Sequence, residues 1–153
     1  MIVVDATAFA AFLLREPQGD AVLEQMLAHD AMLAPGLLAY ELANVIAQAQ
    51  RTGRLDSDAA ERAREQCAGF PWVFEQHASR DRAASLSALS ARHGVSAYRA
   101  AYLDIARHHN CPLLTLDDAL RAAAVREGVQ VLPATWSCSG INRPIMDWAV
   151  GLK

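Results

Sequence analysis

Short apolar runs alternate along this chain with longer segments of helical periodicity, and this alternation limits the fold more than any other feature. The apolar runs predict buried strands over residues 2–4, 31–34, 112–116 and 129–132. The periodic segments predict helices over 7–16, 18–29, about 37–51, 56–68, 80–92, 96–109 and 118–126, whereas the stretch 70–74 is ambiguous. Apolar strands separated by helices are typical of a parallel sheet covered on both faces. We therefore expect an α/β fold, a three-layer α/β/α sandwich around a mostly parallel sheet.

Composition and charge restrict the class of protein. The chain has 153 residues, of which 53% are hydrophobic and 20% charged, as expected for one folded domain. Its net charge of −3 argues against a domain that coats nucleic acid with bulk positive charge, but leaves room for an enzyme with a small local site. Lys153 is the only lysine, which excludes a P-loop, a Schiff-base enzyme and a phosphate-receiver domain.

Cysteines and apolar segments indicate the cellular setting. Cys67, Cys111 and Cys138 form no C-x-x-C pair, so neither a disulfide scaffold nor a zinc ribbon is expected, and Cys111 should be buried and inert. No signal peptide precedes the first apolar run, and no apolar stretch approaches the roughly 20 residues that span a bilayer. We therefore expect a cytoplasmic protein without a membrane association.

Three acidic residues stand where an open parallel sheet gathers its ligands. Asp5 ends the first expected strand and Asp117 ends the 112–116 strand, so both should reach one crevice at the carboxyl ends of the strands if these strands are neighbours. Glu41 lies in a helical segment whose other residues are mostly apolar, where an unpaired carboxylate is costly. Together the three carboxylates suit Mg²⁺ or Mn²⁺.

Each acid also has an ordinary structural interpretation. Asp5 caps the helix that follows it in this interpretation, Asp117 and Asp118 form an N-cap pair, and Glu41 is a solvated residue at a helix edge. The combination is the stronger argument, because each acid stands at the expected place in one topology.

Five stretches carry a resemblance to a known family. The chain resembles the PIN-domain family, particularly the VapC-like toxin ribonucleases of type II toxin–antitoxin systems, over roughly residues 1–132. The matching stretches are Ile2–Ala8, Leu13–Pro17, Tyr40–Val45, and Val95–Leu103 continuing to Leu113–Asp117.

The resemblance implies a site and partners as well as a fold. It implies that Asp5, Glu41 and Asp117 are catalytic, metal-binding acids, that Thr7 and Thr115 orient them, and that a bound Mg²⁺ or Mn²⁺ supports cleavage of RNA phosphodiester bonds. It further implies an antitoxin protein as a partner.

One position departs from the family pattern. In the family a further acid follows the tyrosine of the Val95–Tyr98 stretch, and here that residue is Arg99. Its guanidinium either pairs with one of the three acids as a substitute for a metal, or turns outward toward an RNA phosphate. Asp104 does not replace the missing acid, because five helical residues correspond to a rotation of roughly 140°; we expect it on a solvated face with Arg107 and His108.

Two functions therefore stay open. One is a metal-dependent endoribonuclease, weakened by Arg99. The other is a catalytically impaired PIN protein that acts by binding RNA or an antitoxin.

Several other features favour structural roles. His108 and His109 are adjacent and should point apart on their helix, and Ser139–Gly140 lacks the context of a hydrolase nucleophile. A basic cluster after the long helix either contacts RNA or forms a solvated helical face; it comprises Arg51, Arg54, Arg62 and Arg64.

The segment 133–153 extends beyond the expected domain over 1–132. It is rich in large apolar residues, which must pack on the domain or on another subunit. We therefore expect a homodimer. The apolar residues of this C-terminal extension are Trp136, Ile141, Ile145, Met146 and Trp148.

Overall fold

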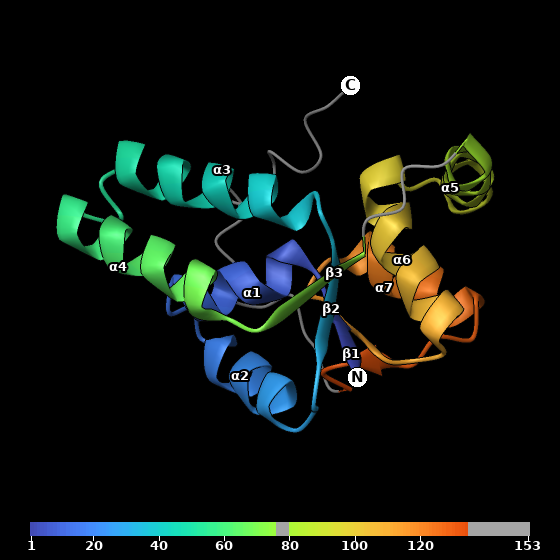
Figure 1. Cartoon of the computed structure of the whole chain (residues 1–153), viewed down its shortest axis with the longest axis horizontal. Helices are drawn as coiled ribbons and strands as arrows, with labels where there is room; N and C mark the ends of the chain where they lie inside the picture. The colour runs from blue at the N-terminus through green and yellow to red at the C-terminus, as the bar shows by residue number, and fades with distance from the viewer. Residues whose placement is uncertain (76–79, 135–153) are drawn as a thin grey trace.

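A computed structural model describes residues 1–75 and 80–134 of the chain. One or two helices separate successive strands in the described part (Figure 1). The strands are β1 (Ile2–Val4), β2 (Met32–Pro35), β3 (Trp72–Glu75), β4 (Leu113–Leu114) and β5 (Val131–Leu132). The helices are α1 (Ala6–Leu13), α2 (Gly19–Leu27), α3 (Leu38–Arg51), α4 (Ser57–Gly69), α5 (Arg80–His93), α6 (Ala97–His109) and α7 (Asp118–Arg126).

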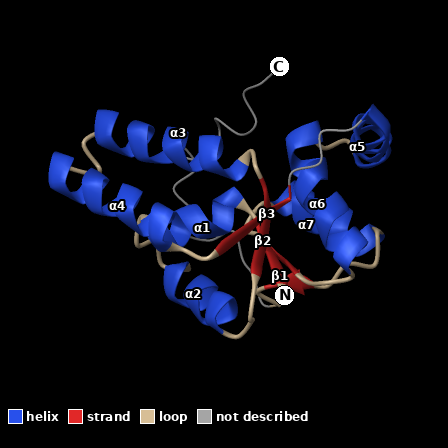
Figure 2. Ribbon diagram, in the orientation of Figure 1, coloured by secondary structure: helices blue, strands red, loops and turns tan. Residues whose placement is uncertain are grey.

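The five strands form one sheet in the order β3-β2-β1-β4-β5, and every pairing is parallel. Helices α1 to α4 lie on one side of this sheet and α5 to α7 on the other (Figures 1 and 2). The expected three-layer α/β/α sandwich is thus confirmed. The strand order reverses between β1 and β4, and in open parallel sheets such a reversal opens a crevice at the carboxyl ends of the strands.

Local signals explain most helix ends. Asp56 and Ser96 accept hydrogen bonds from backbone N–H groups at the starts of α4 and α6. Gly94 and Gly128 follow α5 and α7 with φ values of +65° and +72°, a region that glycine enters without steric cost. Helix α1 ends at Leu13, earlier than the expected residue 16, because the chain turns at Arg15 with a φ of +53°.

The ambiguous stretch 70–74 contributes an edge strand. Trp72 and Phe70 pack against Phe9 of α1, with ring centroids 4.8 and 4.9 Å from the Phe9 ring. Val73 and Phe74 of the same strand remain 48% and 39% exposed. An edge strand with one covered side carries a weaker periodic signal than a central strand, which explains why its sequence alone is ambiguous.

The remaining core lies on both sides of the central strands. It is built from fully buried residues of β1 and β4 together with α1, α6 and α7, such as Ile2, Val3, Leu103, Leu113 and Leu120. Within the residues that the structure describes, no helix is long and apolar enough to cross a membrane. Of the C-terminal extension, residues 135–153 lie outside the described residues, including Ser139–Gly140 and the apolar residues expected to pack.

Candidate functional site

The two strand-end aspartates meet at the strand reversal. β1 and β4 are neighbours, with Val4 paired to Leu114, and Asp5 and Asp117 follow these strands closely. Both also act as N-caps: the Asp5 carboxylate accepts from the Thr7 N–H, and the Asp117 carboxylate accepts from the Leu120 N–H. The capping interpretation and the crevice interpretation of these residues are therefore compatible.

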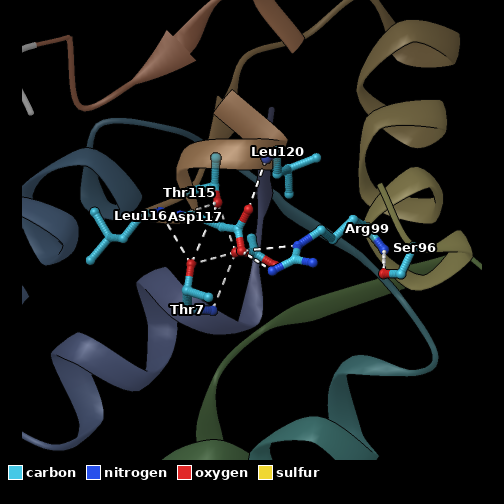
Figure 3. Close-up of polar contacts among 8 residues, drawn as sticks. Thr7, Ser96, Arg99, Thr115, Leu116, Asp117 and Leu120 are labelled. Atoms are coloured by element: carbon cyan, nitrogen blue, oxygen red, sulfur yellow. Dashed lines mark hydrogen bonds and ion pairs between the residues drawn. The ribbon is translucent and has the colours of Figure 1, made fainter. Parts of the chain in front are cut away.

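Two threonine hydroxyls hold Asp5. Its Oδ2 accepts hydrogen bonds from the hydroxyls of Thr7 and Thr115, the latter at 2.7 Å, and the residue is only 4% exposed. Each hydroxyl in turn accepts from a backbone N–H, Thr7 from Leu116 and Thr115 from Asp117, both at 3.1 Å (Figure 3). Because each hydroxyl has one hydrogen, these backbone contacts direct both hydrogens toward Asp5.

Arg99 turns inward and pairs with Asp117. Its Nε and Nη2 donate to Asp117 Oδ2 at 2.9 and 2.5 Å (Figure 3). The other oxygen of Asp117 accepts from the Leu120 N–H at 2.8 Å. Of the two orientations that the sequence leaves open for Arg99, the structure has the one in which the guanidinium is paired with an acid.

Glu41 is held from the opposite side of the sheet. The Tyr102 hydroxyl, in a side chain that is 1% exposed, donates a hydrogen bond to Glu41 Oε2. Tyr102 lies three residues after Arg99 on α6, so the two side chains share one face of that helix. Sequence reasoning gave Tyr102 no role; its spacing from Arg99 was the available signal.

The electrostatics of the site reflect an excess of acid. Burial raises the pKa of Asp5, the nearby Asp117 carboxylate adds to this, and the hydrogen bonds from Thr7 and Thr115 oppose it. Burial also raises the pKa of Glu41 to about 8; the Asp5 charge acts in the same direction, whereas Tyr102 and Arg99 lower it. Three acids thus share one guanidinium, and folding makes two of them harder to ionise.

These side chains line one pocket of about 430 Å³. Asp5, Thr7, Glu41, Arg99 and Asp117 are brought together there, as is Tyr102. Its rim also includes residues to which the sequence assigned no role, namely Tyr40, Asn44 and Tyr98. The volume lies within the roughly 300–1,000 Å³ of typical ligand sites.

The pocket offers carboxylate oxygens, the type of ligand that Mg²⁺ and Mn²⁺ prefer. Among the described residues, hydrogen bonds to Asp5 and Glu41 go to Oδ2 and Oε2, so Oδ1 and Oε1 accept none there. Asp117 is engaged through both oxygens. Within the same part of the chain, no three His, Cys, Asp or Glu side chains form a group that could hold a metal ion.

Two acids named in the sequence analysis lie elsewhere. Asp118 is exposed in the first turn of α7 and does not line the pocket. Asp104 also lies outside the pocket, but the expectation of a solvated face was wrong: it is half-buried and pairs with Arg82 of α5 at 2.9 Å. A partner 22 positions away in sequence is not visible in the helical pattern of α6.

The remaining candidates have local partners. Arg54 pairs with Glu16 at 3.0 Å and Arg64 with Glu61 at 2.8 Å. Arg51 donates to Gln48 at 2.8 Å, and Arg62 is exposed.

The two adjacent histidines and Cys111 differ somewhat from expectation. The rings of His108 and His109 touch edge to face at a centroid distance of 5.1 Å instead of pointing apart, and His109 contacts Glu75. Cys111 is half-buried, not fully buried, and burial raises the pKa of its thiol, which keeps it protonated and poorly reactive at neutral pH.

The fold agrees with comparisons to known proteins. The chain belongs to the PIN domain family, whose model matches residues 2–126. It is 32% identical over 119 residues to ribonuclease VapC3 of Pyrobaculum aerophilum. The alignment covers 78% of this chain and 91% of that protein.

Two crystal structures share the fold at low identity. PAE2754 from Pyrobaculum aerophilum superposes with a TM-score of 0.64 and 21% identity, covering 86% of this chain and 88% of the other. FitAcB from Neisseria gonorrhoeae superposes with a TM-score of 0.59 and 17% identity, covering 86% of this chain and 96% of the other.

Proposed function

We propose that this PIN-domain protein is a metal-dependent endoribonuclease, a VapC-like toxin that hydrolyses RNA phosphodiester bonds. The observation that carries the proposal is the excess of carboxylate in a pocket at the strand reversal, where Asp5, Glu41 and Asp117 face a single arginine. The 32% identity to a protein named ribonuclease VapC3 supports the same activity.

Asp5 and Glu41 are the acids best placed to hold Mg²⁺ or Mn²⁺, since each has a carboxylate oxygen that accepts no hydrogen bond from the described residues. A metal ion held there would polarise the scissile phosphate and make water a stronger nucleophile. Thr7 and Thr115 fix the Asp5 carboxylate, and Tyr102 fixes that of Glu41. The positive charge of such an ion would favour the ionised forms of both acids and so oppose the upward shift of their pKa values.

Arg99 is proposed to weaken the enzyme. Its guanidinium occupies Asp117, so this acid joins a metal site only when the ion pair opens. The same contact favours the second candidate, a catalytically impaired PIN protein that acts by binding RNA or an antitoxin. The two candidates differ in whether the wild-type protein cleaves RNA when a divalent metal is supplied.

Cleavage of a mixed RNA pool tests the proposal. Wild-type protein, Asp5→Asn and the exposed control Asp118→Asn are assayed with Mg²⁺, with Mn²⁺ and with EDTA. We expect weak metal-dependent cleavage by the wild type and Asp118→Asn, and at least about tenfold less by Asp5→Asn because a metal-site charge is lost. Equal cleavage by Asp5→Asn would contradict the site. RNA binding without cleavage in any metal would favour the impaired protein.

The assembly of the protein is also a proposal. We propose an antitoxin partner and a homodimer in which the C-terminal extension packs, with the domain ending at residue 132. Light scattering at micromolar concentration should give twice the chain mass, and a monomeric mass would contradict the dimer.

A further inference from the structure

Two exposed aromatic rings stand at the rim of the acidic pocket. Tyr40 is 77% exposed and Tyr98 is 51% exposed, and both line the pocket. Among the described residues, the other large apolar side chains that are exposed do not line it; they are Met1, Leu27, Val73, Phe74 and Val125. A single exposed apolar residue needs no explanation, but two exposed aromatic rings at one acidic pocket do.

The two rings come from opposite faces of the sheet. Tyr40 is in the first turn of α3, and Tyr98 is in the first turn of α6. These helices begin on either side of the strands' carboxyl ends (Figure 1). Each tyrosine directly precedes a pocket residue, Glu41 or Arg99. Since successive helical residues differ by about 100° in direction, Glu41 and Arg99 turn into the pocket while the tyrosines stay at its rim.

The charge of the site weakens the contribution that contacts to phosphates make to RNA affinity. The protein carries a net charge of −3, and the guanidinium in the pocket is already paired with Asp117. An RNA strand approaching three acids therefore gains little from the usual attraction between phosphates and basic groups. Flat aromatic rings offer a different contribution, because unpaired bases stack on them regardless of sequence.

We infer that Tyr40 and Tyr98 are stacking platforms that bind unpaired bases of the RNA on either side of the pocket. Asn44 lies one helical turn after Tyr40 and lines the same pocket, so its carboxamide can donate to and accept from the edge of a base stacked on that ring. The inference rests on the proposed function for the identity of the ligand. In a duplex the bases are already stacked on one another, and these rings have no free base face to contact.

Binding measured without cleavage tests the inference. Fluorescence anisotropy in EDTA uses a labelled single-stranded RNA of mixed sequence, the same strand with abasic positions, and the matching duplex. The proteins are the wild type, Tyr40→Ala, Tyr98→Ala, both Tyr→Phe variants, and Val125→Ala as an exposed control on α7. Circular dichroism checks folding, which the high exposure of both tyrosines should leave intact.

We expect each alanine variant to bind the single strand about 5- to 150-fold more weakly, while the phenylalanine variants and Val125→Ala stay within about twofold of wild type. The abasic strand and the duplex should bind wild type more weakly and be insensitive to the alanine changes. Four results would each overturn the inference. The alanine variants could bind the single strand as tightly as wild type, or the phenylalanine variants could bind it as weakly as the alanine variants. The wild type could bind the duplex as tightly as the single strand, or bind no RNA at all.

The outcomes also separate this inference from the proposed activity. Base-dependent binding that is lost in the alanine variants, with no metal-dependent cleavage, would keep the stacking role and reject the ribonuclease. Metal-dependent cleavage with an unchanged KM in both alanine variants would keep the ribonuclease and reject the stacking role.

Discussion

The two ends of helix α6 carry opposite arrangements of charge. At its N-terminal end, Arg99 faces the pocket, where Asp5, Glu41 and Asp117 outnumber it. Folding raises the pKa of Asp5 and Glu41, chiefly through burial. These two acids in the pocket therefore ionise less easily than free carboxylic acids do.

At the C-terminal end of α6, one acid has several partners. Glu127 contacts His93 at 2.6 Å, Arg107 of α6 at 3.0 Å and Arg92 at 3.2 Å. The hydrogen bond from His93 lowers the pKa of Glu127 most, although partial burial opposes it. We call these four residues the Glu127 cluster. Here folding favours the charged carboxylate.

The difference separates a structural cluster from a candidate functional site. The Glu127 cluster joins the ends of α5, α6 and α7 and stabilises the fold when its acid is ionised. The pocket does the reverse, because its ionised acids repel one another and lose solvent. Acids kept at a cost to stability, in a crevice at a strand reversal, indicate function more strongly than their residue types do.

The largest stability effect is expected for Glu41→Gln. A pKa of about 8 in the folded protein, against 4.5 for an ordinary Glu, means that rising pH destabilises the fold between these values, because the unfolded chain releases this proton first. Allowing for solvent screening of a half-buried side chain, we expect Glu41→Gln to gain about 2 kcal/mol at pH 8 and nothing at pH 4. Urea unfolding at both pH values measures this, and a loss of stability at pH 8 would contradict it.

A somewhat smaller effect is expected for Thr115→Val. This change removes a hydroxyl that donates to Asp5 and accepts from the Asp117 N–H, and it leaves a buried donor without its partner. We expect a loss of about 1–2 kcal/mol in urea unfolding. Thr115→Ser, which keeps the hydroxyl, should lose less. Equal losses in both variants would show that the methyl group, and not the hydrogen bonds, matters at this position.

For the Glu127 cluster we expect Glu127→Gln to lose about 1 kcal/mol at pH 7. Its pKa is lowered in the folded protein, so its contribution is present above the ordinary value of 4.5 and is lost as the pH falls below it. The variant should therefore equal wild type once the pH is well below 4. Glu24→Gln, exposed on α2, is the control. A loss that persists in strong acid would show that charge is not its cause.

The sequence predicts the pocket better than it predicts the contacts inside it. Asp5 and Asp117 follow apolar strands, and the rule for parallel sheets places them at one edge without knowledge of side-chain rotamers. The partner of Arg99 depends on which way a long side chain turns, and the partner of Asp104 on how α5 packs against α6. Tertiary contacts of this kind leave no periodic signal in the sequence. For the same reason the sequence does not predict the contact between Tyr102 and Glu41.

In the proposed site, Arg99 occupies an acid that a bound metal ion would otherwise share. Calorimetric titration of Mn²⁺ into wild type, Arg99→Ala and Arg99→Asp tests it most directly. Relative to wild type, Arg99→Ala changes the pocket charge by −1, and Arg99→Asp changes it by −2 and adds an oxygen ligand. We expect Arg99→Asp to bind Mn²⁺ most tightly, Arg99→Ala less tightly and wild type most weakly. Wild-type binding as tight as that of Arg99→Asp would contradict it.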